Sequence, residues 1–210
     1  PYNLSDASDR TSLVTTPYGQ SPVTVSYTAN STHAYTAIGG TNRSHDTNGN
    51  LTDDGTFTYT YDYRNQLLTA TRKSNSHVEG TYEYDALGRR TKKTLYDESS
   101  VRYYHDGLHE IEEYDENGDL LRKYVYREEI DSIAMMEAAD VADVDEDENT
   151  SELVRLYYHQ DARTNVAWLT GPDESVVESY AYDPYGTAAI KDQGGDPISV
   201  SAVGNPFTFQ

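Results

Sequence analysis

Histidines and carboxylates are the side chains with which this chain could do chemistry. The six histidines are His33, His45, His77, His105, His109 and His159. Two histidines four residues apart on a helix can hold zinc, and His105 and His109 have that spacing. Gly107 lies between them in a turn-like His-Asp-Gly sequence, which argues against a helix. We therefore predict turn and strand-surface positions for the histidines, and no metal ligands.

The acidic segment 143–149 alternates oxygen-bearing side chains in the manner of a calcium-binding loop. Such a loop needs glycine at its sixth position and a bidentate glutamate at its twelfth. Glu148 and Val154 occupy those two positions here. A solvated loop is therefore the favoured interpretation, and weak calcium binding by charge alone stays open.

Paired acids and serines are the remaining candidates for catalysis. Two close carboxylates can act as general acid and base, but 36 Asp and Glu in 210 residues bring carboxylates together by chance. The chain has no Gly-x-Ser-x-Gly elbow and no cysteine. We predict no catalytic, cofactor-binding or metal-binding residue, and hence a chain that is not an enzyme.

The charge balance excludes some partners. Lys and Arg number 16 against 36 Asp and Glu, so the net charge is −20. Nucleic acids and anionic membrane surfaces attract cationic proteins, so neither is expected as a partner. No apolar run approaches the roughly 20 residues of a membrane-spanning helix.

Tyrosine decides between disorder and a β-fold. Few aliphatic residues together with a high net charge are typical of disordered chains. This chain, however, has 20 Tyr against three Phe and one Trp. A tyrosine ring buries a large apolar area, keeps a hydroxyl for hydrogen bonding, and favours strands. We therefore predict an ordered β-structure.

Turns that begin with aspartate recur along the chain. Gly, Asn or Thr follows three residues after Asp46, Asp62, Asp85, Asp115, Asp161 and Asp183, and Tyr precedes four of these six. Such an aspartate accepts hydrogen bonds from the backbone of its own turn, and Gly or Asn tolerates the positive φ that follows. Alternating runs such as 57–63 lie between the turns. The pattern predicts an all-β fold of antiparallel hairpin repeats.

Three stretches depart from this pattern. Residues 1–34 are weakly patterned, with candidate strands at 13–16 and 23–27. Residues 135–152 are acidic and lack aromatic side chains, so we expect an exposed inserted loop there. The best candidate for a helix in the chain spans 133–141. A second loop is expected at 191–204.

Several segments resemble a known family. Tyr-Glu-Tyr-Asp-Ala-Leu-Gly-Arg-Arg at 82–90, and the segments 49–55 and 59–67, resemble the tyrosine–aspartate (YD) repeat of Rhs and teneurin-type proteins. The segments 157–161, 177–186 and 205–210 resemble the opening of the Rhs repeat-associated core. The resemblance covers about 35–134 and 153–210.

This resemblance implies a β-sheet that spirals into a large hollow shell. In bacterial members the shell often encloses a toxin from the same polypeptide, and in animal relatives it belongs to an extracellular adhesion molecule. We expect this chain to be a piece of a longer polypeptide, because a closed shell is several times longer. Its sheet edges would pair with further chain or another copy. The family's self-cleavage motif lies further along than the Asp-Pro-Tyr-Gly at 183–186, so protease activity is not carried over.

Patterning, composition and the resemblance together give four segments. They are a weakly patterned N-terminal β segment 1–34, YD repeats 35–134, an acidic inserted loop 135–152 and the start of a core-like region 153–210. The predicted function is structural, as part of the shell or scaffold wall of a large bacterial protein that is secreted or displayed on the cell surface. Two alternatives stay open. One is a carbohydrate-binding or adhesive module that presents its tyrosine face, and the other is a toxin-encapsulating shell whose cargo and cleavage site lie beyond residue 210.

Overall fold

The fold is known from a computed structural model that describes residues 2–5, 9–16, 21–128, 132–139, 153–183 and 186–207. Twenty strands and no helix occur in these ranges, and each paired strand runs antiparallel to its neighbour. The predicted all-β class is therefore confirmed. Within the same ranges, nothing has the length and apolarity of a membrane-crossing helix.

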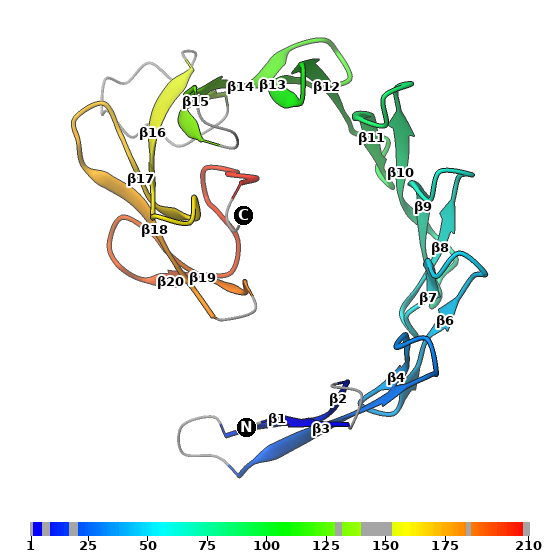
Figure 1. Cartoon of the computed structure of the whole chain (residues 1–210). Coiled ribbons are helices and arrows are strands. Elements are labelled where there is room, and N and C mark those ends of the chain that lie inside the picture. The colour runs from blue at the N-terminus through cyan, green and yellow to red at the C-terminus, as the bar shows by residue number, and fades with distance from the viewer. Residues whose placement is uncertain are drawn as a thin grey trace. The chain divides into compact units, whose positions relative to one another are not determined.

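The chain divides into two compact units, of which the first is Pro1–Ser99. In this unit β1 to β5 form one sheet in chain order, and β6 to β11 also pair in chain order (Figure 1). Its strands are β1 (Tyr2–Leu4), β2 (Arg10–Thr15), β3 (Val23–Ala29), β4 (Tyr35–Ile38), β5 (Thr41–Asn42), β6 (Ser44–His45), β7 (Leu51–Asp53), β8 (Phe57–Tyr61), β9 (Leu67–Arg72), β10 (Val78–Tyr84) and β11 (Arg90–Leu95).

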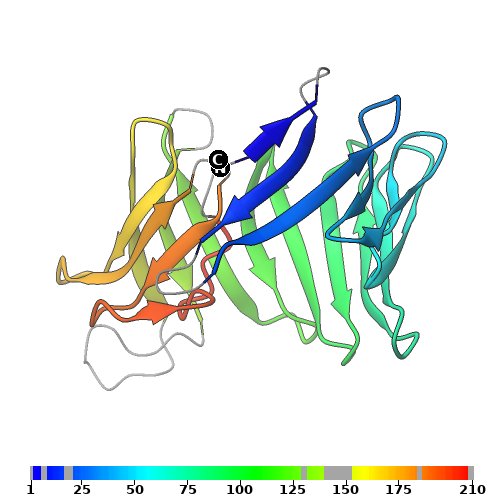
Figure 2. The same cartoon turned by 90° about the horizontal axis from the view of Figure 1, so that it is seen from below.

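The second unit is Ser100–Gln210, and its strands again pair in chain order. Figure 2 shows its green strands side by side as long arrows. The strands are β12 (Ser100–Asp106), β13 (His109–Tyr114), β14 (Leu120–Tyr126), β15 (Ile133–Ala138), β16 (Val154–Gln160), β17 (Val166–Thr170), β18 (Val176–Tyr182), β19 (Ala188–Lys191) and β20 (Pro197–Ile198).

The aspartate turns adopt the predicted geometry, as Asp62 illustrates. Its backbone N–H donates to the Gln66 carbonyl at 2.9 Å, and the Asn65 N–H donates back to the Asp62 carbonyl at 3.1 Å. The Asp62 carboxylate accepts the N–H groups of Arg64 and Gln66 at 2.8 and 2.9 Å. Asn65 takes a positive φ of 66°. Local hydrogen bonding therefore reverses the chain without help from distant residues.

The same pair of backbone bonds recurs at the other five predicted positions: Asp46, Asp85, Asp115, Asp161 and Asp183. It also recurs at Asp192, within the stretch expected to be a loop, where Gly195 N–H donates to the Asp192 carbonyl. The sequence analysis missed this turn because it assigned the whole stretch 191–204 to a loop. The spacing of Asp192 and Gly195 was the signal available.

The expectations for residues 133–141 need a correction. Ile133–Ala138 forms strand β15, so the candidate helix is wrong, and the acidic loop does not begin at Met135. Met136 and Ala138 are fully buried in the hydrophobic core, and β14 and β16 pair with β15 on its two sides. Tertiary pairing therefore overrides the helical propensity of Ala, Met and Glu. Residues 140–152, including the calcium-like segment, lie outside the described residues.

The hydrophobic core lies in the second unit, on one face of the sheet. It consists of Tyr124, Ile133, Met136, Ala138, Leu156, Tyr158, Val166, Leu169, Val177, Tyr180 and Val203. Val203 comes from the segment after β20, which turns back to the inner side of the curved sheet (Figure 1). We call residues 199–207 the returning segment. It covers the core face of the sheet in this unit.

Candidate functional site

Neighbouring turns at one edge of the first unit are bonded to each other. The turns at Asp46, Asp62 and Asp85 connect alternate strand pairs, so they lie along the same edge of the sheet. The Asn65 side-chain oxygen accepts hydrogen bonds from the amides of Asn48 and Asn50 at 2.9 and 2.8 Å. The first two turns are thus joined directly.

The second and third turns are also joined, here by side chains that donate to backbone carbonyls. The Arg64 guanidinium donates to the Ala86 carbonyl at 2.7 Å, and the Gln66 amide donates to the Gly88 carbonyl at 2.8 Å. Gly88 has φ near 89°, and a Cβ there would lie 3.1 Å from the Gln66 amide nitrogen. We call this series of bonded turns the turn ladder. It fixes the spacing of successive hairpins at the edge of the sheet.

Tyrosine hydroxyls add a second series of bonds between neighbouring strands. Each donates to a backbone carbonyl near the start of the adjacent strand: Tyr61 to Leu51 at 2.9 Å, Tyr84 to Leu67 at 3.0 Å, Tyr126 to Glu110 at 2.8 Å and Tyr182 to Val166 at 2.7 Å. In three of these four cases the tyrosine directly precedes a turn aspartate. The Tyr-Asp pair therefore combines a bond across the sheet with a chain reversal.

The histidines lie where the sequence predicted, on turns and strands. His105 lies on β12 and His109 begins β13, with the turn at Gly107 and Leu108 between the two strands. His77, His109 and His159 stack on the rings of Tyr96, Tyr126 and Trp168. His33 lies 2.9 Å from an Asp9 carboxylate oxygen. Among the described residues, no three His, Asp or Glu side chains form a group that could hold a metal ion.

A buried carboxylate anchors the returning segment. Glu178 on β18 is fully buried, and one of its oxygens accepts the backbone N–H groups of Ala202 and Val203 at 2.6 and 3.3 Å. The other oxygen accepts the hydroxyls of Ser201, at 2.8 Å, and Tyr180. Burial, followed by the bond to Glu178, raises the pKa of the Tyr180 hydroxyl, which therefore stays protonated.

The anchor continues through Asn205, which joins two tyrosines. The Tyr158 hydroxyl donates to the Asn205 side-chain oxygen at 2.6 Å, and the Asn205 amide donates to the Tyr180 hydroxyl at 3.0 Å. Nearby, the Arg122 guanidinium donates a hydrogen bond to Glu113 at 3.0 Å. The same guanidinium packs closely against Gly204, where an added Cβ would lie only 2.2 Å from one of its nitrogens. Polar groups inside the second unit thus hold the returning segment in one position.

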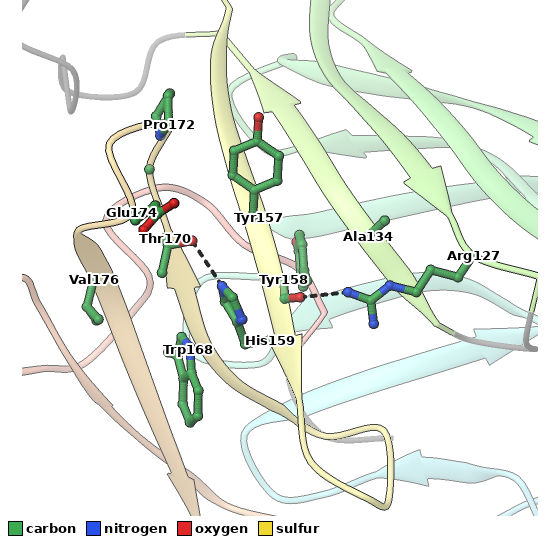
Figure 3. Close-up of a pocket in the computed structure, with 11 residues that line it drawn as sticks. Arg127, Ala134, Tyr157, Tyr158, His159, Trp168, Thr170, Pro172, Glu174 and Val176 are labelled. Atoms are coloured by element: carbon green, nitrogen blue, oxygen red, sulfur yellow. Dashed lines mark hydrogen bonds between the residues drawn. The ribbon is translucent and has the colours of Figure 1, made fainter.

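The opposite face of this sheet carries an open cavity of about 800 Å³ (Figure 3). Tyr157, His159 and Trp168 line it, and residues Tyr157 and Trp168 are 39% and 45% exposed. The His159 ring nitrogen Nε2 lies 3.0 Å from the Thr170 hydroxyl. Glu174, from the turn that follows β17, adds a carboxylate to the lining. The sequence analysis singled out tyrosines in general and not Trp168, although tryptophan occurs once in the chain.

Comparison with curated proteins finds similar sequences among bacterial nucleases. The chain is 27% identical over 187 residues to the tRNA3(Ser)-specific nuclease WapA of Bacillus spizizenii, and 27% identical over 187 residues to the tRNA nuclease WapA of Bacillus subtilis strain 168. Each alignment covers 88% of this chain and 7% of the relative, so the chain spans a small part of these proteins. No family model matches the chain.

Comparison with solved structures finds the same fold. The chain matches the crystal structure of TcdB2-TccC3 without its hypervariable C-terminal region, with a TM-score of 0.66 and 12% identity, over 99% of this chain and 10% of that one. It also matches the crystal structure of TcdB2-TccC3, with a TM-score of 0.61 and 14% identity, over 92% of this chain and 10% of that one.

These findings confirm the resemblance to the Rhs and YD-repeat family that the motifs predicted, and the chain has the fold of an Rhs-type structural segment. They also require a correction. The prediction that the chain is not an enzyme is contradicted, because the curated relatives are named tRNA nucleases. That prediction rested on missing motifs, which say nothing about the chemistry of a longer polypeptide.

Proposed function

We propose that this chain forms a stretch of the wall of a YD-repeat shell, and that the polypeptide to which the stretch belongs is a nuclease that acts on tRNA. The wall role is supported above all by the turn ladder, in which the turns at Asp46, Asp62 and Asp85 are joined by side-chain bonds as well as by strand pairing. A sheet whose neighbouring hairpins are bonded to each other in this way can extend by the addition of further hairpins.

Within this wall, we propose that 35–134 are YD repeats and 153–210 are the start of the core-like region, as the sequence motifs indicate. The sheet edges would pair with further chain of the same polypeptide, because unpaired strand edges expose backbone donors and acceptors. The relatives' names support the nuclease role. Secretion or display at the cell surface is part of the proposal and follows from the family resemblance.

The charge of the chain fits a wall that keeps RNA outside. A net charge of −20 repels polyphosphates, so an intact acidic wall would hinder tRNA from reaching an enclosed nuclease. The wall would therefore protect the producing cell until it is opened. The repulsion would weaken at high ionic strength, since salt screens exposed charges over about 10 Å at 0.1 M.

Two measurements on the polypeptide that carries this chain test the proposal separately. Electron cryomicroscopy should show a hollow particle with residues 35–134 in its wall; a compact particle without an interior would refute the wall. Incubation with tRNA should give little cleavage before, and strong cleavage after, the particle is opened by limited proteolysis, with a DNA hairpin of equal length as the control. Absence of tRNA cleavage in both states would refute the nuclease role and leave the wall standing.

A further inference from the structure

Two asparagines of this chain are followed directly by glycine: Asn48 precedes Gly49, and Asn117 precedes Gly118. An asparagine in this position is prone to deamidation, because glycine has no side chain to keep its own backbone nitrogen away from the asparagine amide. Both pairs lie at exposed tips of aspartate turns, the first between β6 and β7 (Figure 1) and the second between β13 and β14. The two sites are therefore alike in sequence and in local fold.

A backbone hydrogen bond slows the reaction at each site. The Gly49 N–H donates to the Asp46 carbonyl at 3.1 Å, and the Gly118 N–H donates to the Asp115 carbonyl at 3.3 Å. Deamidation begins when the glycine nitrogen attacks the asparagine side-chain carbon, so this bond must break first. Both asparagines therefore react faster when their turn is open, and the backbone alone gives neither site a large advantage.

The side-chain amides distinguish the two sites. The Asn117 amide donates to the Asp115 carboxylate of its own turn at 3.2 Å. The Asn48 amide donates to the Asn65 side-chain oxygen of the next turn at 2.9 Å, so it must leave the turn ladder before its carbon can approach the glycine nitrogen. We propose that Asn48 is a deamidation site which the turn ladder protects, and that its conversion removes a bond between the first two turns of the ladder.

The reaction needs water and no other reagent. The Gly49 nitrogen forms a bond to the Asn48 side-chain carbon, and the amide nitrogen leaves as ammonia with the proton of the Gly49 N–H. A cyclic succinimide remains, and water opens it at one of its two carbonyl carbons. Opening at the side-chain carbon gives aspartate. Opening at the backbone carbon gives isoaspartate, in which the main chain continues through the former side chain.

Conversion replaces a donor by a carboxylate at the junction of two turns. A carboxylate at position 48 cannot donate to the Asn65 oxygen, and it lies in the same turn as the Asp46 carboxylate. Asn65 could donate to it by turning its amide over, but the Asn50 amide, which donates to the Asn65 oxygen at 2.8 Å, would then lose that acceptor. Isoaspartate also lengthens the main chain of the turn. Neither effect depends on the wall or nuclease role proposed above.

Peptide mapping by mass spectrometry measures both sites in one sample of the folded polypeptide that carries this chain, incubated in mildly alkaline buffer. Asn117 should convert at least about threefold faster than Asn48, since one hydrogen bond changes an equilibrium by a factor of about 2–10. In concentrated urea the turns are unfolded, and the two asparagines should then convert at rates within about twofold of each other.

A matched pair of glycine variants tests the protection. Asn65→Gly removes the acceptor and suits the positive φ of 66° at this position. It should speed conversion of Asn48 at least about threefold, by loss of one hydrogen bond, and leave Asn117 unchanged. Thr164→Gly makes the same change at a turn position that also has a φ of 66°, in the second unit, and should alter neither rate. Circular dichroism establishes that each variant is folded.

Asn48→Asp supplies one product directly and tests its effect on the ladder. Amide hydrogen exchange at Asn50 and Gln66, whose N–H groups donate to their own turn aspartates, should accelerate at least about threefold. Asn117→Asp places the same product in a turn whose asparagine bonds within that turn, and should leave exchange at these two residues unchanged.

Three results would overturn the proposal. The first is equal conversion of Asn48 and Asn117 in the folded protein. The second is a rate at Asn48 that Asn65→Gly leaves unchanged, or raises no more than the rate at Asn117. The third is exchange at wild-type rates in Asn48→Asp. If Asn65→Gly does not fold, the comparison of the two asparagines in the wild-type protein decides.

Discussion

Removing the carboxylate of Glu178 should release the returning segment of the second unit. Glu178 is fully buried and accepts four hydrogen bonds, two of them from the backbone N–H groups of Ala202 and Val203. In Glu178→Ala these two N–H groups lose their acceptor and cannot rotate towards another. Each buried donor left unpaired costs about 1–3 kcal/mol, so the two together cost about 2–6 kcal/mol.

That cost is limited by the free energy that holds the segment in place. If docking is worth less than the cost, the segment detaches, its N–H groups bond to water, and the strands stay paired. Amide hydrogen exchange of residues 199–207 is therefore the appropriate assay. We expect exchange at Ala202 and Val203 to accelerate at least roughly 30-fold in Glu178→Ala, because each 1.4 kcal/mol is a tenfold change.

Glu178→Gln is the discriminating variant. Its amide oxygen can still accept the two backbone N–H groups, and the hydroxyls of Tyr180 and Ser201 can accept from its NH₂ group. We expect a cost of about 1 kcal/mol, seen as roughly fivefold faster exchange. Glu83→Ala, which removes a carboxylate whose side chain is 66% exposed, is the control and should leave exchange of the segment unchanged.

The reasoning is refuted if Ala202 and Val203 exchange at wild-type rates in Glu178→Ala. It is also refuted if the Gln variant is as damaging as the Ala variant. The first outcome would mean that other contacts of the segment suffice. The second would mean that the negative charge, and not the set of acceptors, is what matters.

The remaining predictions concern the turns and the tyrosines. Gly88→Ala should lower the free energy of unfolding in urea by about 1–2 kcal/mol or more, because φ is near 89° and the new Cβ meets a neighbouring side chain. Gly49→Ala has a similar φ, near 90°, but open space around the new Cβ, so it measures the cost of the backbone conformation alone and should lower that free energy less. Tyr84→Phe should cost about 0.5–1.5 kcal/mol through its lost carbonyl bond, and an unchanged urea midpoint would count against the structural role of the hydroxyl. Burial raises the pKa of Tyr59 and of Tyr182 to about 12, so these hydroxyls keep their protons in the folded state at pH values above about 10, where the unfolded chain loses them. The melting temperature should therefore fall between about pH 10 and 12, and a melting temperature that does not change there would contradict this. Hydrogen bonds within the turns lower the pKa of several turn aspartates below the ordinary value of 3.8. Their stabilisation is therefore present above that pH and should be lost as the pH falls below it, which acid titration of the circular dichroism signal would reveal.

The turns are the part of the fold that residues close together in the sequence determine. The bonds that build the Asp62 turn connect residues no more than four positions apart, so the residues that form the turn are neighbours in the sequence. The same holds at Asp85, where the carboxylate accepts the Leu87 and Arg89 N–H groups. Spacing alone therefore predicted six turns, and the same spacing of Asp192 and Gly195 would have predicted a seventh.

Strand β15 shows where local sequence fails. Ala, Met and Glu favour a helix, yet Ile133–Ala138 is extended because the chain before and after it returns to pair on both sides. Likewise, the number of acidic residues in the chain could not indicate that Glu178 is buried and paired while Glu83 is exposed. Both outcomes depend on residues far away in the chain.

The sequence by itself determined the all-β class, the positions of the turns and the resemblance to YD-repeat proteins, because each depends on short-range hydrogen bonding and spacing. Tertiary structure alone decided which face of β16 and β17 is buried and what the returning segment covers. The Tyr158 hydroxyl and the Asn205 side chain that meet beneath that segment are 47 residues apart. Such a contact forms only when the hairpins have stacked and brought distant positions together, so no local pattern encodes it.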